Sequence, residues 1–367
     1  MSKQFAPLRW GWAAAFALLS LTTSAFAQHF TRTDLTVNQA SVSMTAKNID
    51  PNLVNAWGLA RGSGTPWWVS DNGTGLTTLY NGGGVAQALV VQIPLPKNAT
   101  GMAAPTGAVF NYDPNGFKVG GAVPLFLFVT EDGTISGWSP AFTDKTKAML
   151  AIDRSKHAVY KGVALGQIHG TTFLYATNFK RREIEVYRSD WHRTFLPFWA
   201  FRDPRVPRDY SPFNIQNVGG NLVVTFAKTQ RGSDDEAHGA GLGFVSIFDT
   251  EGRLVQRLEH GRFLNAPWGV VLTPSDFGVF SHRLLIGNFG DGTIHAFDLL
   301  TGRFEGTVED STNKPLSIDG LWALGFGNDG AAGNANTMYF TAGPNDEGDG
   351  LLGTIVPVAA EQRGNTE

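Results

Sequence analysis

Short apolar runs separated by glycine-containing turns recur along the chain, and one stretch shows the pattern in full. Trp268–Leu272 and Leu284–Gly287 are apolar runs, and Thr293–Phe297 alternates in the manner of a half-buried β-strand. Between the last two, Asp291-Gly292 fits a type I′ hairpin turn, because both central residues of that turn need positive φ. The stretch therefore predicts three antiparallel strands of one four-stranded sheet.

Six units of this kind follow one another at nearly equal spacing. The first strand of each carries a small or polar marker residue, and successive markers lie 49, 55, 52, 55 and 53 residues apart. The markers are Gly58, Gly107, Gly162, Asn214, Gly269 and, less regularly, Trp322. This spacing suits a four-stranded propeller blade and is too long for a helical or leucine-rich repeat. Radial repetition buries both faces of every sheet, so an all-β, six-bladed β-propeller is predicted in preference to a β-sandwich or two small barrels.

The last unit has no fourth strand, while an unassigned strand pattern lies near the start of the chain at Phe30–Val37. Pairing that segment with Leu351–Pro357 would close the ring and remove an open sheet edge. The propeller is therefore expected to span residues 28–358, followed by a polar tail over 359–367. In the other units, fourth strands are predicted at Ala86–Ile93, Ala148–Ile152, Leu196–Phe201, Leu254–Leu258 and Arg303–Val308.

Two groups of aromatic residues need a place in this fold. Trp57, Trp268 and Trp322 recur at the first strands and are expected to pack near the centre of the ring. The run Phe195–Phe201 is interpreted as an outer strand packed between blades, and an exposed platform for a sugar or a lipid is the alternative. The favoured interpretation places both groups in the core.

Polar residues gather at one end of the predicted ring. Strands in a blade run up and down, so the start of a first strand and the end of a second strand lie on the same face. Carboxylates and amides occupy these points, and Ca²⁺ takes about six to eight such oxygen ligands. The metal candidates are Asp71, Glu131, Asn178 and Asn288, and the other candidates for a ligand-binding rim are Asn55, Asn72, Asp132, Asn214, Lys228, Asn265 and Asp346. The competing interpretation is that Asp and Asn at these points only hold turns.

The first 27 residues have the three parts of a secretory signal peptide. Lys3 and Arg9 precede an apolar segment, Trp10–Leu21, and Ala25-Phe26-Ala27 suits the cleavage site. That segment is too short to span a membrane, so the mature protein is expected to be secreted or periplasmic and not membrane-bound. Cleavage would change the formal charge from −3 to −5, because Lys3 and Arg9 are the only charged residues removed. This charge argues against a nucleic-acid partner, which needs a concentrated basic face.

Several familiar kinds of active site have no support in the sequence. The absence of cysteine excludes disulfides, thiolate metal sites and a cysteine nucleophile. There is no GxSxG, no HExxH, no P-loop and no GxGxxG between a strand and a helix. Nucleophile-elbow hydrolases, zinc proteases and nucleotide-binding folds are therefore not indicated.

Nine segments carry a resemblance to known proteins: NLVNAWGLA (52–60), WVSDNGTGLTTLYNG (68–82), EDGTISGW (131–138), YKGVAL (160–165), PFNIQNVGG (212–220), NAPWGV (265–270), NFGDGTIHAFD (288–298), IDGLWAL (318–324) and YFTAGPNDE (339–347). With them the chain resembles a family of exported bacterial proteins of unknown function that has a giant-virus member, which implies a propeller without a known activity. More distantly, the units are similar to NHL-type repeats and to the gluconolactonase group of six-bladed propellers. That similarity implies a divalent metal at the channel mouth and an Asp as general base. Asn214 and Asp319 stand at comparable places, although Asn55-Ala56-Trp57 replaces the Glu expected in the first blade.

Two functions are open at this point. The first is a non-catalytic propeller that binds a small ligand, a cation or a protein partner at the channel mouth. The second is a metal-dependent hydrolase of the lactonase type, with Asp319 as the base and Asn214 with Asp71 or Glu131 as metal ligands. The first is favoured because no complete catalytic set is visible. A catalytic carboxylate should be partly buried, with its pKa shifted by a neighbour or a metal.

Overall fold

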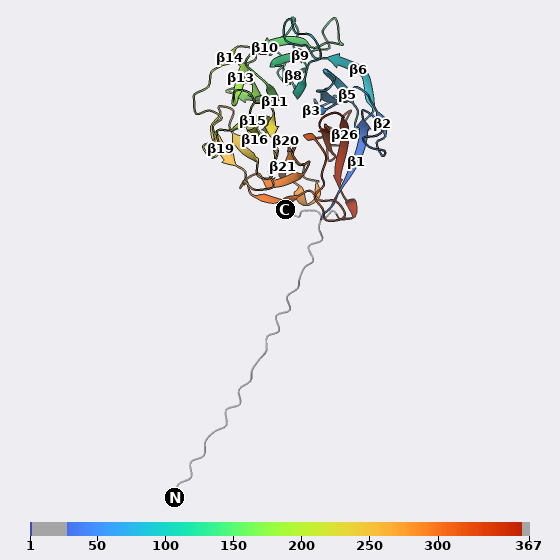
Figure 1. Ribbon diagram of the computed structural model, residues 1–367, viewed down its shortest axis with the longest axis vertical. Helices are drawn as coiled ribbons and strands as arrows, with labels where there is room; N and C mark the ends of the chain where they lie inside the picture. The colour runs from blue at the N-terminus through green and yellow to red at the C-terminus, as the bar shows by residue number, and fades with distance from the viewer. Residues whose placement is uncertain (2–27, 362–367) are drawn as a thin grey trace.

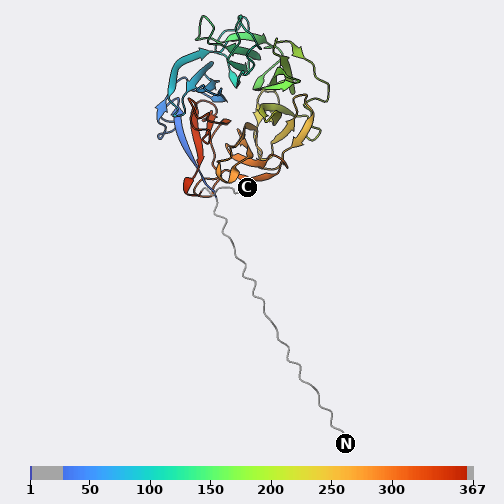
Figure 2. The same ribbon diagram turned by 180° about the vertical axis from the view of Figure 1, so that it is seen from behind.

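The chain forms a ring of six β-sheets, five of them antiparallel and one with a single parallel strand pair, as a computed structural model describes for Met1 and residues 28–361 (Figures 1 and 2). Residues 2–27 of the predicted signal peptide and residues 362–367 of the predicted tail lie outside the described residues. The helices within the described residues are two 3₁₀ helices, η1 (Gly278–Phe280) and η2 (Ala359–Glu361). Neither could cross a membrane. The predicted all-β, six-bladed β-propeller is confirmed.

Blades 1 to 3 each have four strands, ordered from the centre of the ring outwards. Blade 1 has β3 (Ala56–Ala60), β4 (Trp67–Asp71), β5 (Leu76–Tyr80) and β6 (Ala86–Gln92). Blade 2 has β7 (Pro105–Phe110), β8 (Phe126–Thr130), β9 (Thr134–Trp138) and β10 (Met149–Asp153). Blade 3 has β11 (Tyr160–Ile168), β12 (Thr171–Asn178), β13 (Glu183–Arg188) and β14 (Arg193–Thr194).

Blades 4 to 6 repeat the arrangement with additions. Blade 4 has β15 (Tyr210–Val218), β16 (Asn221–Thr229), β18 (Gly243–Phe248) and β19 (Leu254–Arg257), and the short β17 (Glu236–Ala237) pairs with β16. Blade 5 has β20 (Pro267–Leu272), β21 (Arg283–Asn288), β22 (Ile294–Asp298) and β23 (Phe304–Thr307). Blade 6 has β24 (Leu321–Phe326), β25 (Met338–Ala342), β26 (Leu351–Pro357), β1 (Phe30–Val37) and β2 (Asn48–Ile49).

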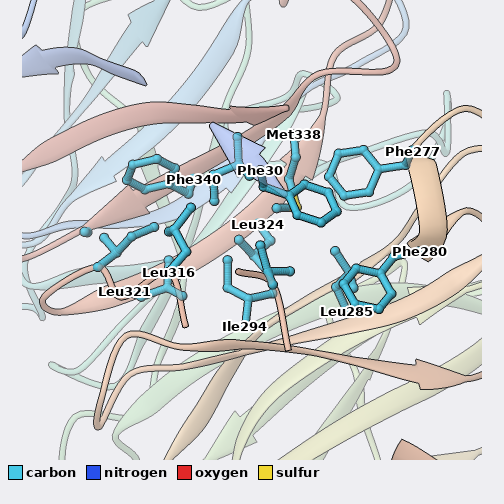
Figure 3. Close-up of a cluster of buried hydrophobic side chains, with 14 of the residues drawn as sticks. Phe30, Phe277, Phe280, Leu285, Ile294, Leu316, Leu321, Leu324, Met338 and Phe340 are labelled. Carbon is cyan, nitrogen blue, oxygen red and sulfur yellow. The ribbon is translucent and has the colours of Figure 1, made fainter. Parts of the chain in front are cut away.

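Strands from the two ends of the sequence close the ring in blade 6. β1 pairs antiparallel with β26, with Phe30 opposite Pro357 and Val37 opposite Leu351, which is the pairing that the missing fourth strand predicts. The closure is also packed, because the ring of Phe30 lies 5.3 Å from that of Phe277 and 5.7 Å from that of Phe280 in blade 5 (Figure 3). β1 therefore contributes both backbone pairing and core contacts.

The marker glycines lie where neighbouring first strands meet at the centre of the ring. A Cβ on Gly58 would lie 2.2 Å from the carbonyl oxygen of Thr106, and one on Gly107 would lie 2.8 Å from the amide nitrogen of Val163. Neither site has space for a side chain, so close approach of the blades requires glycine. In blade 6 the tryptophan Trp322 is the counterpart of Trp268, and the residue that matches the marker Gly269 is therefore Ala323, not Trp322 as predicted.

The predicted fourth strand Leu196–Phe201 of blade 3 is wrong. The strand in this place is the two-residue β14, after which Phe198 to Ala200 form a turn. Pro197 has no backbone N–H to donate to a sheet, and its carbonyl accepts the hydrogen bond from the amide of Ala200 that forms the turn. Phe195 and Phe198 consequently lie in the solvent and not between blades.

Candidate functional site

An aromatic cluster closes the central channel near the starts of the first strands. This cluster, the plug, consists of Trp57, Phe179, Phe213, Trp268, Phe289 and Trp322. The ring of Trp322 stacks on those of Trp57 and Phe289, at centroid distances of 3.6 and 3.9 Å. The prediction that the three tryptophans pack near the ring centre is confirmed.

Blade 3 places a lysine where other blades place an aromatic residue of the plug. Lys161 directly precedes the marker Gly162, as Trp57 precedes Gly58 and Trp268 precedes Gly269. Its side chain is only 2% exposed, and its ammonium lies 5.2 Å from the ring centroid of Trp57. The first strand of blade 3 therefore brings a cation to the top of the plug.

Three carboxylates surround this buried ammonium. Lys161 Nζ donates to Glu131 Oε1 at 2.6 Å and lies 3.6 Å from Asp235 Oδ1 and 3.8 Å from Glu236 Oε2. Burial alone would lower the pKa of Lys161, but the neighbouring Glu131 and Glu236 outweigh it and raise this pKa. Lys161 is therefore a permanently charged, structural cation and not a nucleophilic amine.

A chain of hydrogen bonds ties this ion pair to the adjoining blades. Asn72 Nδ2 donates to Glu131 Oε2 at 2.9 Å, and Asn55 Nδ2 donates to Asn72 Oδ1 at 3.2 Å and to Glu347 Oε2 at 2.5 Å. Asn55 Oδ1 in turn accepts a hydrogen bond of 2.8 Å from Trp322 Nε1 in the plug. We call the set Asn55, Asn72, Glu131, Lys161, Glu236 and Glu347 the mouth.

Negative charge exceeds positive charge at the mouth. Glu236 on β17 is buried, and its Oε2 has no hydrogen-bond partner among the described residues. Burial, reinforced by the carboxylates of Glu236 and Glu131, raises the pKa of Glu347 from 4.5 to about 7. His238, whose Nε2 lies 3.6 Å from Glu236 Oε1, has its pKa raised by that carboxylate. The excess negative charge at the mouth therefore favours the protonated forms of Glu347 and His238.

The four predicted metal ligands do not come together. Asp71 is fully buried in blade 1, where its Oδ2 accepts a hydrogen bond of 2.8 Å from Thr78 and burial raises its pKa well above the usual range. Asn178 donates to Glu185 Oε1 at 3.0 Å and Asn288 to Asp291 Oδ1 at 3.2 Å, each within its own blade. Glu131 alone faces the mouth.

The parity of the strands explains this separation. Asp71, Asn178 and Asn288 are the last residues of their second strands, whereas Glu131 follows the last residue of β8. Successive side chains of a strand point to opposite sides, so one step along the chain decides whether a side chain enters the blade or faces the mouth. Asn72, one residue beyond Asp71, accordingly meets Glu131.

The other rim candidates, apart from Asn55 and Asn72, do not join the mouth network. Asp346 is exposed. The remaining four bind backbone groups or a surface charge: Asp132 the amide of Ala104 (2.7 Å), Asn214 the carbonyl of Trp268 (2.7 Å), Asn265 the amide of Gly239 (2.6 Å) and Lys228 the carboxylate of Asp209 (3.5 Å). Turn and backbone contacts therefore account for most of the rim.

The residues named for a lactonase are likewise dispersed. Asp319 is exposed and accepts a hydrogen bond of 2.9 Å from the amide of Asn345. Asn214 lies on β15 against Trp268, and Asp71 is enclosed in blade 1. Within residues 28–361, no three His, Asp or Glu side chains are placed to hold a metal ion together. Calcium binding stays a prediction. The carboxylates that belong to the mouth are those of Glu131, Glu236 and Glu347.

The other end of the channel is open. The ends of the first strands of all six blades line a cavity of about 700 Å³, which we call the funnel. Its residues include Leu59, Arg61, Phe110, Leu165, Gln216, Leu272, Leu324 and Phe326. A small cavity of about 30 Å³ lies deeper along the same strands, lined in part by Asn214 and Trp268. No residue pattern in the sequence indicated the funnel.

Among the described residues, Arg61 is the only charged side chain that lines the funnel. Its Nε donates to the carbonyl oxygen of Phe326, and its guanidinium lies 5.7 Å from the ring centroid of Trp67. Burial lowers the pKa of Arg61, against the opposing influence of Asp329, but a guanidinium keeps its charge at any physiological pH. The funnel therefore combines apolar side chains with the amides of Gln167, Gln216 and Asn217 and one fixed positive charge.

Solved propellers share this fold at low sequence identity. Virginiamycin B lyase from Staphylococcus aureus superimposes with a TM-score of 0.50 at 10% identity, covering 90% of this chain and 100% of the lyase. A glucose dehydrogenase superimposes with a TM-score of 0.51 at 12% identity, covering 83% of this chain and 96% of that enzyme. These likenesses concern the propeller architecture alone.

Two uncharacterized proteins of Acanthamoeba polyphaga mimivirus are similar to the chain along most of its length. One is 32% identical over 321 residues, covering 84% of this chain and 76% of the viral protein. The other is 30% identical over 328 residues, covering 86% of this chain and 83% of the viral protein. No protein-family model matches the sequence. Through these two relatives, the chain belongs to the family of the uncharacterized mimivirus proteins.

Proposed function

We propose that this protein is an exported, non-catalytic propeller that binds a small, largely apolar molecule with an anionic group in the funnel. The observation that carries the proposal is a cavity of about 700 Å³ enclosed by all six blades. Small-ligand pockets typically measure about 300–1,000 Å³, with mostly apolar walls and a few polar groups that orient the ligand. The volume of the funnel lies in this range, and its walls combine apolar side chains with several polar groups.

Arg61 would select the anionic group. Its Nε is occupied by the carbonyl of Phe326, while the described residues take no hydrogen bond from its two terminal nitrogens. Those nitrogens can bind a carboxylate in a bidentate manner, with more strength in apolar surroundings than in water. The amides of Gln167 and Gln216 offer further hydrogen bonds at the walls.

The chemistry of the lining supports binding in preference to catalysis. Within residues 28–361, no Asp, Glu, His, Lys, Ser or Thr lines the funnel, and the phenol of Tyr112 is its only side-chain hydroxyl. A general base or a nucleophile would be expected among such side chains. The mouth does carry these groups, but there Lys161, Glu131 and Asn72 are engaged with one another and cover a closed plug.

The test is titration calorimetry of the propeller with octanoate and with octyltrimethylammonium, which has a similar apolar chain and the opposite charge. Octanoate should bind more tightly. Replacing Arg61 by Gln removes a charge-assisted contact of about 1.5–3 kcal/mol and should weaken octanoate binding roughly tenfold to a hundredfold.

Two further variants locate the binding. Leu272→Trp narrows the funnel and should weaken both ligands, whereas Arg231→Gln, at an exposed arginine outside the funnel, should change neither. Equal octanoate affinities for the parent protein and Arg61→Gln would contradict the assignment of Arg61. Absence of binding of either ligand to the parent would contradict the proposed function.

A further inference from the structure

A cluster of aromatic residues projects from the outer edge of the ring. Phe195 and Phe198 are 83% and 84% exposed, and Trp199 is also exposed. We call residues 195–199 the aromatic loop. It follows β14 and runs along the outer edge between β14 and β19 (Figure 1). This loop is the part of the run Phe195–Phe201 that the propeller core does not use.

The aromatic loop is anchored at its C-terminal end, so the exposure of its tip follows from the fold. Phe201 is buried at its C-terminal end, where its ring lies 5.4 Å from that of Phe248 and 5.8 Å from that of Tyr175. The amide of Phe201 donates to the carbonyl oxygen of Gly252 at 2.8 Å. Burial of Phe195 and Phe198 would be favourable, and the folded propeller leaves both side chains exposed.

Positive charge accompanies the aromatic loop in an otherwise acidic protein. The chain carries a formal charge of −3, yet residues 192–208 contain four arginines and one acidic residue. That acid, Asp203, is buried and paired with Arg257 at 2.8 Å. Arg202, Arg205 and Arg208 are exposed, and they form no ion pair with the described residues. Their charge is available to a partner.

Two arginines make cation–π contacts with rings of the aromatic loop. The guanidinium of Arg193 lies 5.2 Å from the ring centroid of Phe195, and that of Arg253 lies 5.7 Å from the ring centroid of Trp199. Aromatic rings beside basic residues are typical of segments that sit at the boundary between lipid headgroups and acyl chains. Anionic lipids attract arginine at a similar depth.

We propose that the aromatic loop docks the propeller on an anionic lipid surface. Phe195 and Phe198 enter the headgroup boundary, and Arg202, Arg205 and Arg208 contact the lipid phosphates. A bilayer accepts projecting side chains without shape complementarity, whereas a protein partner needs a fitted recess for them. The funnel lies at the centre of the ring, so this surface acts independently of ligand binding.

The test is co-sedimentation of residues 28–367, which contain every blade, with two kinds of vesicle. One is phosphatidylcholine mixed with phosphatidylglycerol, and the other is phosphatidylcholine alone. The protein should bind the first vesicles more strongly, and added salt should weaken binding because it screens the arginines. Phe195→Ser with Phe198→Ser should abolish most of the binding.

Matched variants separate this surface from general stickiness. Leu300→Ser removes an apolar residue that is 89% exposed in the β22–β23 turn and should not change binding. Arg202→Gln, Arg205→Gln and Arg208→Gln should each weaken binding to the anionic vesicles about fivefold. A parent protein that stays in the supernatant would overturn the proposal. So would a dimer in light scattering that the double serine variant converts to a monomer, since the loop would then be a protein interface.

Discussion

Lys161 offers the sharpest test of how the mouth is held together. Replacing it by methionine keeps an unbranched apolar stem within the plug and removes the ammonium. Glu131 and Glu236 then lose the cation that lies 2.6 and 3.8 Å from them. The side chain of Glu236 is only 5% exposed, so water cannot replace the lost charge. We expect a large loss of stability at neutral pH.

The size of this loss follows from the burial of the three side chains. Removing one partner of a buried ion pair typically costs about 3–5 kcal/mol, because the other charge is left uncompensated. Glu131 is 26% exposed and is partly screened, so the lower end of this range, about 3 kcal/mol, is expected. In a protein of this size that corresponds to a fall in melting temperature of roughly 4 °C.

Thermal melts followed by circular dichroism would measure the effect against two companions. Lys228→Met removes the ammonium of an exposed pair with Asp209 and should cost less than about 1 kcal/mol. Adding Glu131→Gln and Glu236→Gln to Lys161→Met removes the stranded charges and should restore most of the lost stability. The reasoning fails if Lys161→Met melts with the parent, or if the triple variant is no more stable than the single one.

Two more predictions concern the closure of the ring and the proton at the mouth. Deleting residues 30–37 removes β1 and exposes the edge of β26, so the circular dichroism melt should shift sharply downwards; a melt like that of the parent would contradict closure by β1. Because the pKa of Glu347 rises from 4.5 to about 7 on folding, the native state binds more protons between these values, and stability should fall as pH rises through this range, by up to roughly 3 kcal/mol. Glu347→Gln should remove this part of the pH dependence in denaturant titrations at pH 5 and pH 8, while the neighbouring Asp346→Asn should retain it.

The fold was predictable because the spacing of the strands, the glycine-containing turns and the apolar pattern all recur from unit to unit. The predicted third strand Thr293–Phe297 matches β22 (Ile294–Asp298) to within one residue at each end. Such strands are buried between neighbours and alternate clearly, so the pattern alone locates them. Outer strands pack on fewer neighbours, and their pattern is weaker. The error at Leu196–Phe201 arose there, since aromatic composition suggested a strand while Pro197 opposed it.

The site was harder to predict because it depends on single-residue parity and on contacts between blades. Asp71 and Asn72 are adjacent, yet one enters the blade and the other faces the mouth. Lys161 did leave a signal, since it stands before Gly162 where the units of Trp57 and Trp268 have an aromatic residue. The funnel left no such signal, because its lining residues are spread over all six units and no local pattern joins them.

Side-chain size along the first strands determines which end of the channel is open. The plug sits near the strand starts, where Trp57 and Trp322 stack across the axis. Towards the strand ends, small residues such as Ala108 and Ala164 line the funnel. A ligand can therefore enter only from the funnel side, and the carboxylates of the mouth act on the stability of the plug. If so, Lys161→Met should lower the melting temperature but leave the octanoate affinity of the folded protein unchanged. Arg61→Gln should do the reverse, and a variant at either end that altered both properties would show that the two ends are coupled through the plug.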